Sequence, residues 1–347
     1  MSCSFSKAVP AVCIDVDGVL KRGNVAIPSA RSAILKLRKF NIPFAILTNN
    51  GGETEQTFAL KWSKLLNLPT HDYFKSNEIV LCHSPMKNAL KQYKTKNQLV
   101  LVTGNGNIHE VMLNYNCNNF ITVNEYTQMF PEIFPFFYPI NTSKSHSQHI
   151  KRIVSNRIGK PISTYPPIKA VIQLSDMINW EINVQLLTDI LISSNGIPGN
   201  IRPPSTPQHV DYHLACNDLL FMDKFNLPRF ACGSFFMTLN NLFTIKYHQH
   251  INHIIYGKPS SLIFNYARSL ISTRTSLPIT NFYMIGDNPS VDIRGANVNG
   301  YHSILVRTGI FKGKRNCKEY PAKTVCDDVG EAVDYILRTE RFGCGLL

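Results

Sequence analysis

Two carboxylates lie two residues apart near the start of the chain, directly after an apolar segment. Residues 11–16 are apolar up to Asp15, and Asp17 and Gly18 follow. A carboxylate such as Asp15 can attack phosphorus as a nucleophile, while Asp17 can serve as the general acid and base for the leaving group and water. Gly18 would let the backbone approach phosphoryl oxygens. A solvated turn is the alternative interpretation, since Asp and Gly are common turn residues.

A second pair of carboxylates, Asp287 and Asp292, occurs in the segment GDNPSVD at 286–292. Four carboxylates that converge without a counterion would repel one another, and a hard divalent cation held by oxygen atoms relieves that repulsion. We therefore expect Mg²⁺, ahead of Ca²⁺, where the two pairs meet. A helix capped by Asn288 explains Asn288 and Pro289 but not Asp287. Capping and metal binding are compatible.

Two further side chains suit chemistry on a phosphate group. Thr48 ends the apolar segment 43–47 and offers a hydroxyl to a phosphoryl oxygen, and Asn49 can position the loop that follows. Lys258, in Gly-Lys-Pro at the start of a predicted helix, supplies a positive charge beside a nucleophilic carboxylate and a phosphate. Each residue alone is uninformative. Their order along the chain with the two aspartate motifs is the informative feature.

The elements that must position these residues alternate between strand and helix. Buried strands at 11–16 and 43–47 flank a helix after Pro28, which predicts a parallel βαβ unit. The last third of the chain has the same pattern, with helices at 260–271, from 288, and at 331–337, and strands at 282–285 and 303–306. Both ends of the chain are therefore expected to build one α/β sheet. Such sheets place ligands at the carboxyl ends of their strands.

The middle of the chain reads as a second α/β unit. Strands are predicted at 98–103 and 169–174, and an amphipathic helix at 180–192. The stretch 131–167 holds six prolines and a Ser/His/Lys-rich centre, and its weak periodicity predicts a long loop. We interpret the basic residues near 144–160 as part of a solvated loop and not as a contact for nucleic acid or anionic lipid. Nucleic acid is therefore not expected as a partner.

Four segments, DVDGVL, LTNNGG, YGKPS and GDNPSVDIRGAN, occur in this order and resemble the four motifs of the haloacid dehalogenase superfamily. More narrowly, they resemble its capped branch, in which an α/β cap is inserted between the second and third motifs. The resemblance implies a Rossmann-like parallel sheet core over 1–95 and 225–347. It also implies an inserted α/β cap over 96–224.

The resemblance also implies roles for individual residues. Asp15 is expected to be the nucleophile and Asp17 the acid/base, with Thr48 and Lys258 as phosphate ligands. Magnesium is expected on Asp15, Asp17 (through its carbonyl) and Asp287, with Asp292 supporting. Expected contacts to substrate are Gly18, Asn49, Asn50, Asn217 and Asp218, of which the last two lie where the cap returns to the core and fit a polar turn equally well.

The function expected from these residues is that of a Mg²⁺-dependent phosphohydrolase, which acts on a small phosphorylated metabolite through an aspartyl-phosphate intermediate. A phosphotransferase or mutase with the same intermediate is the alternative among enzymes. Lys and Arg number 36 against 23 Asp and Glu, a net charge of +13. That charge leaves a non-enzymatic anion-binding protein as the alternative from another class.

The composition of the chain bears on the cellular compartment in which the protein is expected. The nine cysteines are scattered, with no CxxC pair, which favours a reducing compartment. No apolar run reaches the ~18 residues of a spanning helix. Little sequence precedes the first strand, so a cytoplasmic location is expected, and the family resemblance suggests mitochondria as the alternative.

Overall fold

The computed structural model describes residues 8–135, 143–221, 225 and 227–342. The chain divides into two compact units. The described residues of the first unit fall within Met1–Asn49, Glu55–Ser84 and Gly257–Leu347, and those of the second within Asn50–Thr54 and Pro85–Tyr256. Each unit is built around its own parallel sheet.

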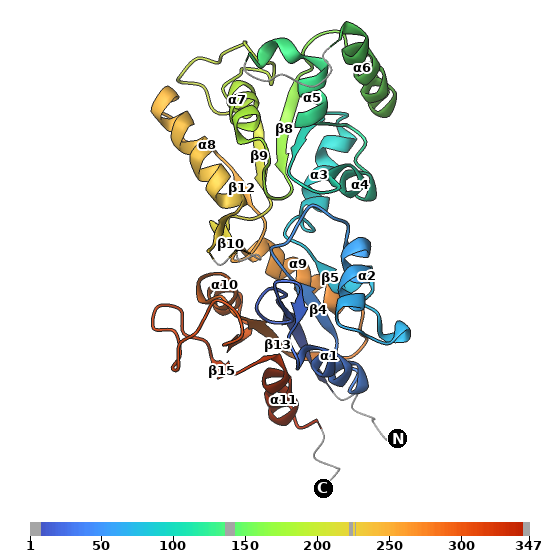
Figure 1. The fold of residues 1–347 in the computed structure, drawn as a ribbon, viewed down its shortest axis with the longest axis vertical. Helices are drawn as coiled ribbons and strands as arrows, with labels where there is room; N and C mark the ends of the chain where they lie inside the picture. The colour runs from blue at the N-terminus through green and yellow to red at the C-terminus, as the bar shows by residue number, and fades with distance from the viewer. Residues whose placement is uncertain (1–7, 136–142, 222–224, 226, 343–347) are drawn as a thin grey trace. The chain divides into compact units, whose positions relative to one another are not determined.

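The first unit has a six-stranded sheet in which every pairing is parallel. Its order is β15 (Thr324–Cys326), β14 (His302–Val306), β13 (Ile279–Gly286), β1 (Val9–Ile14), β4 (Phe44–Leu47) and β5 (Ile79–Val80). Strands from the two ends of the chain thus lie side by side, blue beside orange and red in Figure 1. The prediction of one α/β sheet from both chain ends is confirmed.

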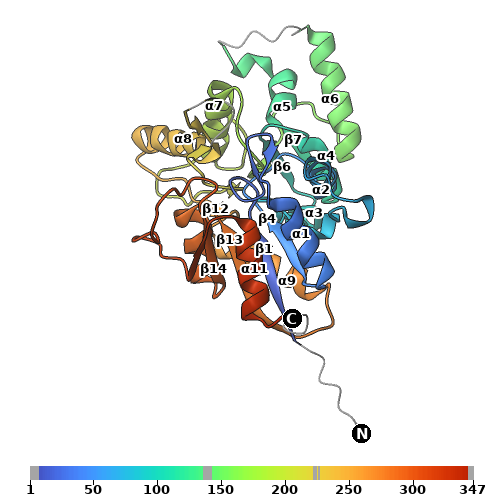
Figure 2. The ribbon, with the colours of Figure 1, turned by 60° about the horizontal axis from the view of Figure 1, so that its bottom comes forward.

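Helices cover both faces of this sheet because alternate residues of a buried strand point to opposite sides. Val12 and Ile14 of β1 pack in one core with α1 (Ala30–Lys39), α2 (Glu55–Leu65) and α11 (Val329–Thr339). Ala11 and Cys13 pack in another with α9 (Ser261–Ser272) and α10 (Arg294–Val298). Figure 2 shows α1 beside α11 on one side of the strands and α9 on the other.

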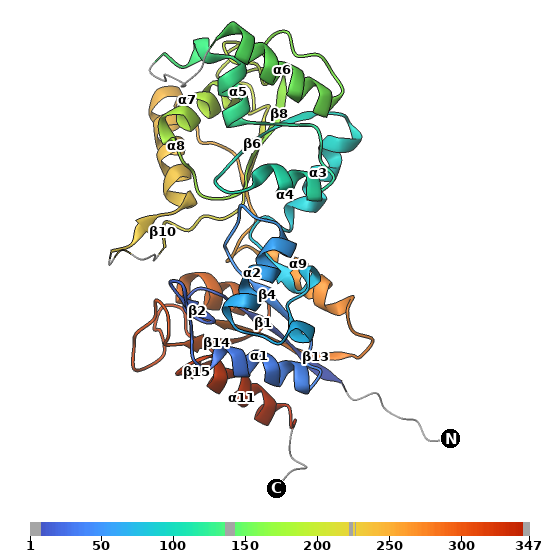
Figure 3. The same ribbon diagram turned by 45° about the vertical axis from the view of Figure 1, so that its right-hand side comes forward.

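The second unit has a five-stranded sheet, again parallel throughout. Its order is β12 (Ile254–Ile255), β9 (Asp211–Leu214), β8 (Ile168–Gln173), β6 (Leu99–Thr103) and β7 (Phe120–Thr122). One face packs against α5 (Val123–Met129), α6 (Lys144–Ile158), α7 (Trp180–Leu191) and α8 (Cys232–Tyr247). Helix α3 (Met86–Thr95) lies on the other face, with α4 (Ile108–Asn114) nearby (Figure 3).

Short elements complete the two units. Each has one small antiparallel pair, β2 (Lys21–Arg22) with β3 (Val25–Ala26) in the first and β10 (Leu220–Phe221) with β11 (Arg229–Phe230) in the second. Single helical turns occur at Thr70–Asp72, Ser76–Glu78, Pro131–Ile133 and Pro289–Ile293. Within the described residues, no helix is both long and apolar enough to span a bilayer.

The second unit is larger than the 96–224 segment expected from the sequence. Its main segment runs from Pro85 to Tyr256, and Asn50–Thr54 belongs to it as well. Helix α8 extends it because Phe235, Leu239 and Phe243 pack in the second core, and β12 belongs to it because it pairs with β9.

The prediction of a long loop over 131–167 is wrong, because α6 occupies Lys144–Ile158. The Ser143 hydroxyl accepts a hydrogen bond from the His146 N–H, and Gly159 ends the helix at a φ of 69°. Val154 is the fully buried side chain of this helix. A helix with so narrow an apolar stripe shows little periodicity in its sequence, and the caps were the available signal. Residues 136–142 of the expected loop lie outside the described residues.

Candidate active site

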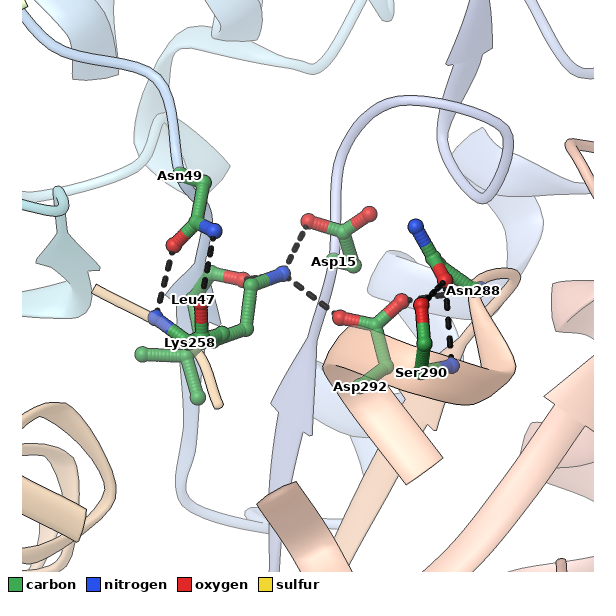
Figure 4. Close-up of polar contacts among 7 residues, drawn as sticks. All are labelled: Asp15, Leu47, Asn49, Lys258, Asn288, Ser290 and Asp292. Carbon is green, nitrogen blue, oxygen red and sulfur yellow. Dashed lines mark hydrogen bonds and ion pairs between the residues drawn. The ribbon is translucent and has the colours of Figure 1, made fainter. Parts of the chain in front are cut away.

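The centre of the site is an ion pair at the carboxyl end of the first sheet (Figure 4). Asp15 follows the last residue of the central strand β1, and its Oδ1 lies 2.6 Å from the Nζ of Lys258. The same Nζ donates to Oδ1 of Asp292 at 2.7 Å and to the carbonyl of Leu47 at 3.0 Å. The three charged side chains are all buried. Lys258 therefore links the ends of three structural segments, at β1, β4 and the turn after β13.

The position of Lys258 is set through its backbone by Asn49. The Lys258 N–H donates to Oδ1 of Asn49 at 2.8 Å, and Nδ2 of Asn49 donates to the Lys258 carbonyl at 3.0 Å. Both hydrogen bonds are visible in Figure 4. Asn49, expected from the sequence as a substrate contact, here orients the lysine.

Three carboxylates converge beside the lysine. One oxygen from each of Asp15, Asp287 and Asp292 lies within 4.8 Å of the others. The backbone N–H of Ile310 donates to Oδ2 of Asp287, and that of Asn288 donates to Oδ2 of Asp292 at 3.0 Å. These contacts fix the direction of each carboxylate before any ligand arrives.

The turn after β13 serves as a helix cap and as a carboxylate holder at once. The side-chain oxygen of Asn288 accepts from the Ser290 N–H at 3.1 Å and from the Ser290 hydroxyl at 2.9 Å. The capping interpretation of this motif is therefore confirmed, and the metal-binding interpretation stays a prediction.

Two glycines leave the room that Asp287 needs. Gly18 has a φ of 78°, and a Cβ built on it would lie 2.4 Å from Oδ2 of Asp287. A Cβ on Gly309 would lie 1.8 Å from the same oxygen. The sequence analysis missed Gly309 and Ile310. They follow β14, so the rule that parallel strands place ligand groups at their carboxyl ends could have found them.

Burial raises the pKa of the Asp15 carboxyl to about 7, with the neighbouring Asp292 adding to the rise and Lys258 opposing it. Burial, followed by the charges of Asp292 and Asp15, raises the pKa of Asp287 well above its ordinary value. Burial would lower the pKa of Lys258, but its ion pairs with Asp15 and Asp292 outweigh that effect and raise it. One buried ammonium thus faces three buried carboxylates. A hard, oxygen-bound divalent cation fits this excess of negative charge.

Other expected site residues of the first unit lie around this cluster. Thr48 is buried directly after β4, and its N–H donates to the carbonyl of Val80 at 3.0 Å. The side chain of Asp17 is 47% exposed and forms an ion pair with Lys21. The carboxylate of Asp17 therefore lies at the exposed edge of the buried cluster, where it contacts the ammonium of Lys21 in the same loop.

Three expected substrate contacts, Asn50, Asn217 and Asp218, belong to the second unit. Within that unit the carbonyl of Asp218 accepts from the N–H of Gly233 at 2.9 Å, so this segment packs against the start of α8. The role of these residues in substrate binding stays a prediction.

Two family models match the segments that carry the site. A haloacid dehalogenase-like hydrolase model covers residues 12–118 and a HAD-hydrolase-like model covers 255–332. The first match contains Asp15 and Thr48, and the second contains Lys258 and Asp287.

Curated relatives extend over nearly all of the chain. A fusion protein of Schizosaccharomyces pombe, cardiolipin synthase (CMP-forming) with a mitochondrial hydrolase, is 32% identical over 343 residues, which are 96% of this chain and 54% of that protein. The chain thus spans about half the length of this relative. A mitochondrial hydrolase of Saccharomyces cerevisiae is 25% identical over 347 residues, 93% of this chain and 94% of that one.

Solved structures share the fold. A possible sugar phosphatase of the HAD superfamily from Cytophaga hutchinsonii has a TM-score of 0.62 at 17% identity, over 94% of this chain and 96% of that one. A calcium complex of glycerol phosphate phosphatase from Mycobacterium tuberculosis has a TM-score of 0.55 at 15% identity, over 92% and 73%. With both family models on the motif-bearing segments, the chain belongs to the haloacid dehalogenase-like hydrolase superfamily.

Proposed function

We propose that the protein is a Mg²⁺-dependent phosphohydrolase that acts on small phosphate esters through an aspartyl-phosphate intermediate. The observation that carries this proposal is the buried Asp15 at the end of the central strand, ion-paired to Lys258 and close to two more buried carboxylates. A buried carboxylate held by a lysine is oriented for attack, and the surrounding charges suit a site for a phosphoryl group and its cation.

The chemistry of the first step follows from the contacts of Asp15. Lys258 holds Oδ1, which orients the carboxylate so that Oδ2 can attack phosphorus in line. The new bond from Oδ2 to phosphorus forms as the bond from phosphorus to the leaving oxygen breaks. After its ion pair with Lys21 opens, Asp17 takes a proton from solvent and gives that proton to the leaving oxygen. Lys258 and the Thr48 hydroxyl offset the charge on the phosphoryl oxygens.

The second step restores Asp15. Asp17, now a carboxylate, takes a proton from water as the water oxygen attacks phosphorus, and the bond from phosphorus to Asp15 breaks. Inorganic phosphate leaves, and the proton balance of the two steps closes. A phosphotransferase would use the same site with an alcohol in place of water, so exclusion of water decides between the two outcomes.

The metal would be held by the carboxylates of Asp15 and Asp287 and by the backbone carbonyl of Asp17. Asp292 supports the site through Lys258, to which it is bonded at 2.7 Å. When bound, Mg²⁺ neutralises charge on these carboxylates and on the phosphoryl group. The donor set consists of hard oxygen atoms, which suits Mg²⁺.

The substrate class rests on the position of the second unit and on the relatives. Both segments of the second unit lie between Thr48 and Lys258 in the sequence, as those of a cap that selects the leaving group would. The neighbours are named for sugar phosphates and glycerol phosphate, and one relative is fused to a CMP-forming cardiolipin synthase. These names favour sugar phosphates, glycerol phosphates and CMP as first substrates to test.

Both curated relatives are named as mitochondrial hydrolases. Their names support the mitochondrial alternative over the cytoplasmic expectation. Imaging a carboxyl-terminal fluorescent fusion against a mitochondrial marker tests this directly, and a diffuse cytosolic signal would contradict it.

The test of the proposed function is phosphate release by the purified protein from these esters, in Mg²⁺ and in EDTA. We expect turnover with Mg²⁺, loss of turnover in EDTA, and loss of turnover in a folded Asp15→Asn variant, because an amide is a poor nucleophile. Asp72→Asn, at another aspartate of the first unit, is the matched control and should keep its activity. Unchanged turnover by Asp15→Asn would overturn the covalent mechanism. Anion binding without turnover by the wild-type protein would favour the non-enzymatic alternative.

A further inference from the structure

Two cysteines of the second unit lie in contact at the base of the β10–β11 hairpin. Cys216 comes two residues after β9, and Cys232 is the first residue of α8. Their Sγ atoms are 2.8 Å apart. The Cys232 thiol also donates to the carbonyl of Cys216 at 2.7 Å. Fifteen residues that include the whole hairpin separate the two in the sequence.

The backbone around the pair holds the two sulfur atoms together. Nε2 of Gln173 on β8 donates to the carbonyl of Cys232 at 3.2 Å, and the N–H of Gly233 donates to the carbonyl of Asp218 at 2.9 Å. A Cβ on Gly233 would lie 2.4 Å from the carbonyl oxygen of Asn217. The start of α8 is therefore packed tightly against the segment that leaves β9. The juxtaposition of the thiols follows from the sheet and the helix start.

We propose that Cys216 and Cys232 form a reversible intramolecular disulfide that closes the base of the β10–β11 hairpin. Disulfide sulfurs lie about 2.05 Å apart, so closure needs a movement of less than about 1 Å. The proposal stands apart from the phosphohydrolase function, since it concerns the second unit alone.

The oxidant that we propose is hydrogen peroxide. Cys216, with 5% of its surface exposed, reacts first, while Cys232 is fully buried. The Cys216 thiolate attacks one peroxide oxygen, the O–O bond breaks, and a sulfenic acid forms. The sulfur of Cys232 then attacks the sulfur of Cys216 and displaces hydroxide, and the two thiol protons end in two water molecules.

The disulfide would restrain a weakly held element. The hairpin has two paired positions, Leu220 with Phe230 and Phe221 with Arg229, and all four residues are exposed. Two-stranded hairpins of this size are marginally stable in water. A covalent tie at the base limits how far the hairpin can open, so it should slow proteolysis at Arg229.

The test is peptide mapping of the full-length protein after brief peroxide treatment, alkylation of the remaining thiols, and trypsin digestion. Cleavage after Lys169, Lys224, Arg229 and Lys246 places Cys216 in peptide 170–224 and Cys232 in peptide 230–246. We expect a linked pair of these two peptides, lighter than their sum by two hydrogens and separated by dithiothreitol. We also expect several-fold slower cleavage at Arg229 under limited trypsin.

Variants make the test specific. Cys216→Ser and Cys232→Ser should each lose the linked peptide and the slower cleavage, while Cys117→Ser, at another buried cysteine of the same unit, should keep both. The wild-type mapping needs no variant, so a variant that fails to fold leaves the proposal open to test. Alkylation of both thiols after a peroxide dose that oxidises the part-exposed Cys317 would overturn the proposal. Pairing of either cysteine with a different partner would overturn it too.

Discussion

The two large sheets in the described part of the chain are both parallel, and each holds a cluster of buried polar side chains, but the clusters differ in charge. In the first sheet, Lys258 faces Asp15, Asp287 and Asp292. In the second, His213 lies between two tyrosines, with Nε2 at 2.7 Å from the Tyr93 hydroxyl and Nδ1 at 2.8 Å from the Tyr256 hydroxyl.

The polar side chains of the cluster in the second sheet form hydrogen bonds with one another. The Tyr93 hydroxyl donates its proton to Asp211 at 2.7 Å, so Nε2 of His213 donates to the Tyr93 oxygen and Nδ1 accepts from Tyr256. Burial lowers the pKa of His213 to about 4, against the smaller opposing effect of Asp211. The imidazole is therefore neutral at physiological pH, and this network has a structural role.

The charges of the cluster in the first sheet do not balance one another. Its three carboxylates outnumber its one ammonium, and burial raises the pKa of two of them. The comparison teaches that buried polar groups mark a ligand site when their charges do not balance. Hydrogen bonding alone does not distinguish the two clusters.

Removing the lysine should have the largest effect. Lys258→Met leaves three buried carboxylates without their ammonium, so we expect kcat/KM for a phosphate ester to fall by at least about 10²-fold, as when a charge-stabilising donor is lost. Steady-state kinetics with saturating Mg²⁺ measures this. Lys36→Met, which removes an ion pair to Asp334 at the surface, is the control and should stay near wild type. Equal activity of the two variants would contradict the role of Lys258.

Magnesium should stabilise the first unit and leave the second almost unchanged. At a concentration of about 100 times its Kd, a ligand that binds only the folded state adds about 2.7 kcal/mol, which corresponds to several degrees in Tm. Each unit holds one tryptophan, Trp62 in α2 and Trp180 in α7. Fluorescence melts of Trp62→Phe and Trp180→Phe variants therefore report on each unit in turn. An equal Mg²⁺ shift for both tryptophans would contradict a site confined to the first unit.

Breaking the neutral network should reduce stability without affecting catalysis. Tyr93→Phe leaves the buried His213 without its hydroxyl partner, which costs about 1–3 kcal/mol. Urea denaturation followed through Trp180 measures the loss, and Tyr320→Phe in the first unit serves as the comparison. We expect kcat/KM to stay within about twofold of wild type. A loss of activity as large as that of Lys258→Met would give the His213 network a catalytic role.

The smallest expected effect is an opposite response of the two units to pH in EDTA. The pKa of Asp15 is raised from 3.8 to about 7 on folding, so its contribution to stability is present at low pH and is lost as the pH rises through 7. The pKa of His213 is lowered from 6.5 to about 4, so its contribution is present above 6.5 and is lost as the pH falls toward 4. The single-tryptophan variants, melted at pH 5 and pH 8, should show these opposite trends by a few degrees. If the Tm of both units changed in the same direction with pH, the opposite pKa shifts of Asp15 and His213 would be contradicted.

The positions of Asp15, Thr48, Lys258 and Asp287 at the ends of segments could be predicted from the sequence. Continuous apolar runs are typical of strands buried on both faces, and parallel strands bring their carboxyl ends to one edge. Both rules can be applied to the few residues around each motif, because they need only a local pattern of residue types. Helix α6 could not be predicted in this way, because a helix with one fully buried side chain shows almost no hydrophobic periodicity in its sequence.

The sequence by itself determined the strand ends, the residues placed there and the inserted second unit. Tertiary structure alone decided which partners meet: Asn49 on the backbone of Lys258, the loop of Gly309 against Asp287, and the contact of Cys216 with Cys232. Lys258 and Asp15 are 243 residues apart along the chain. Their contact depends on how two ends of one chain pair in a sheet, and no local pattern of residue types encodes a distance of that kind.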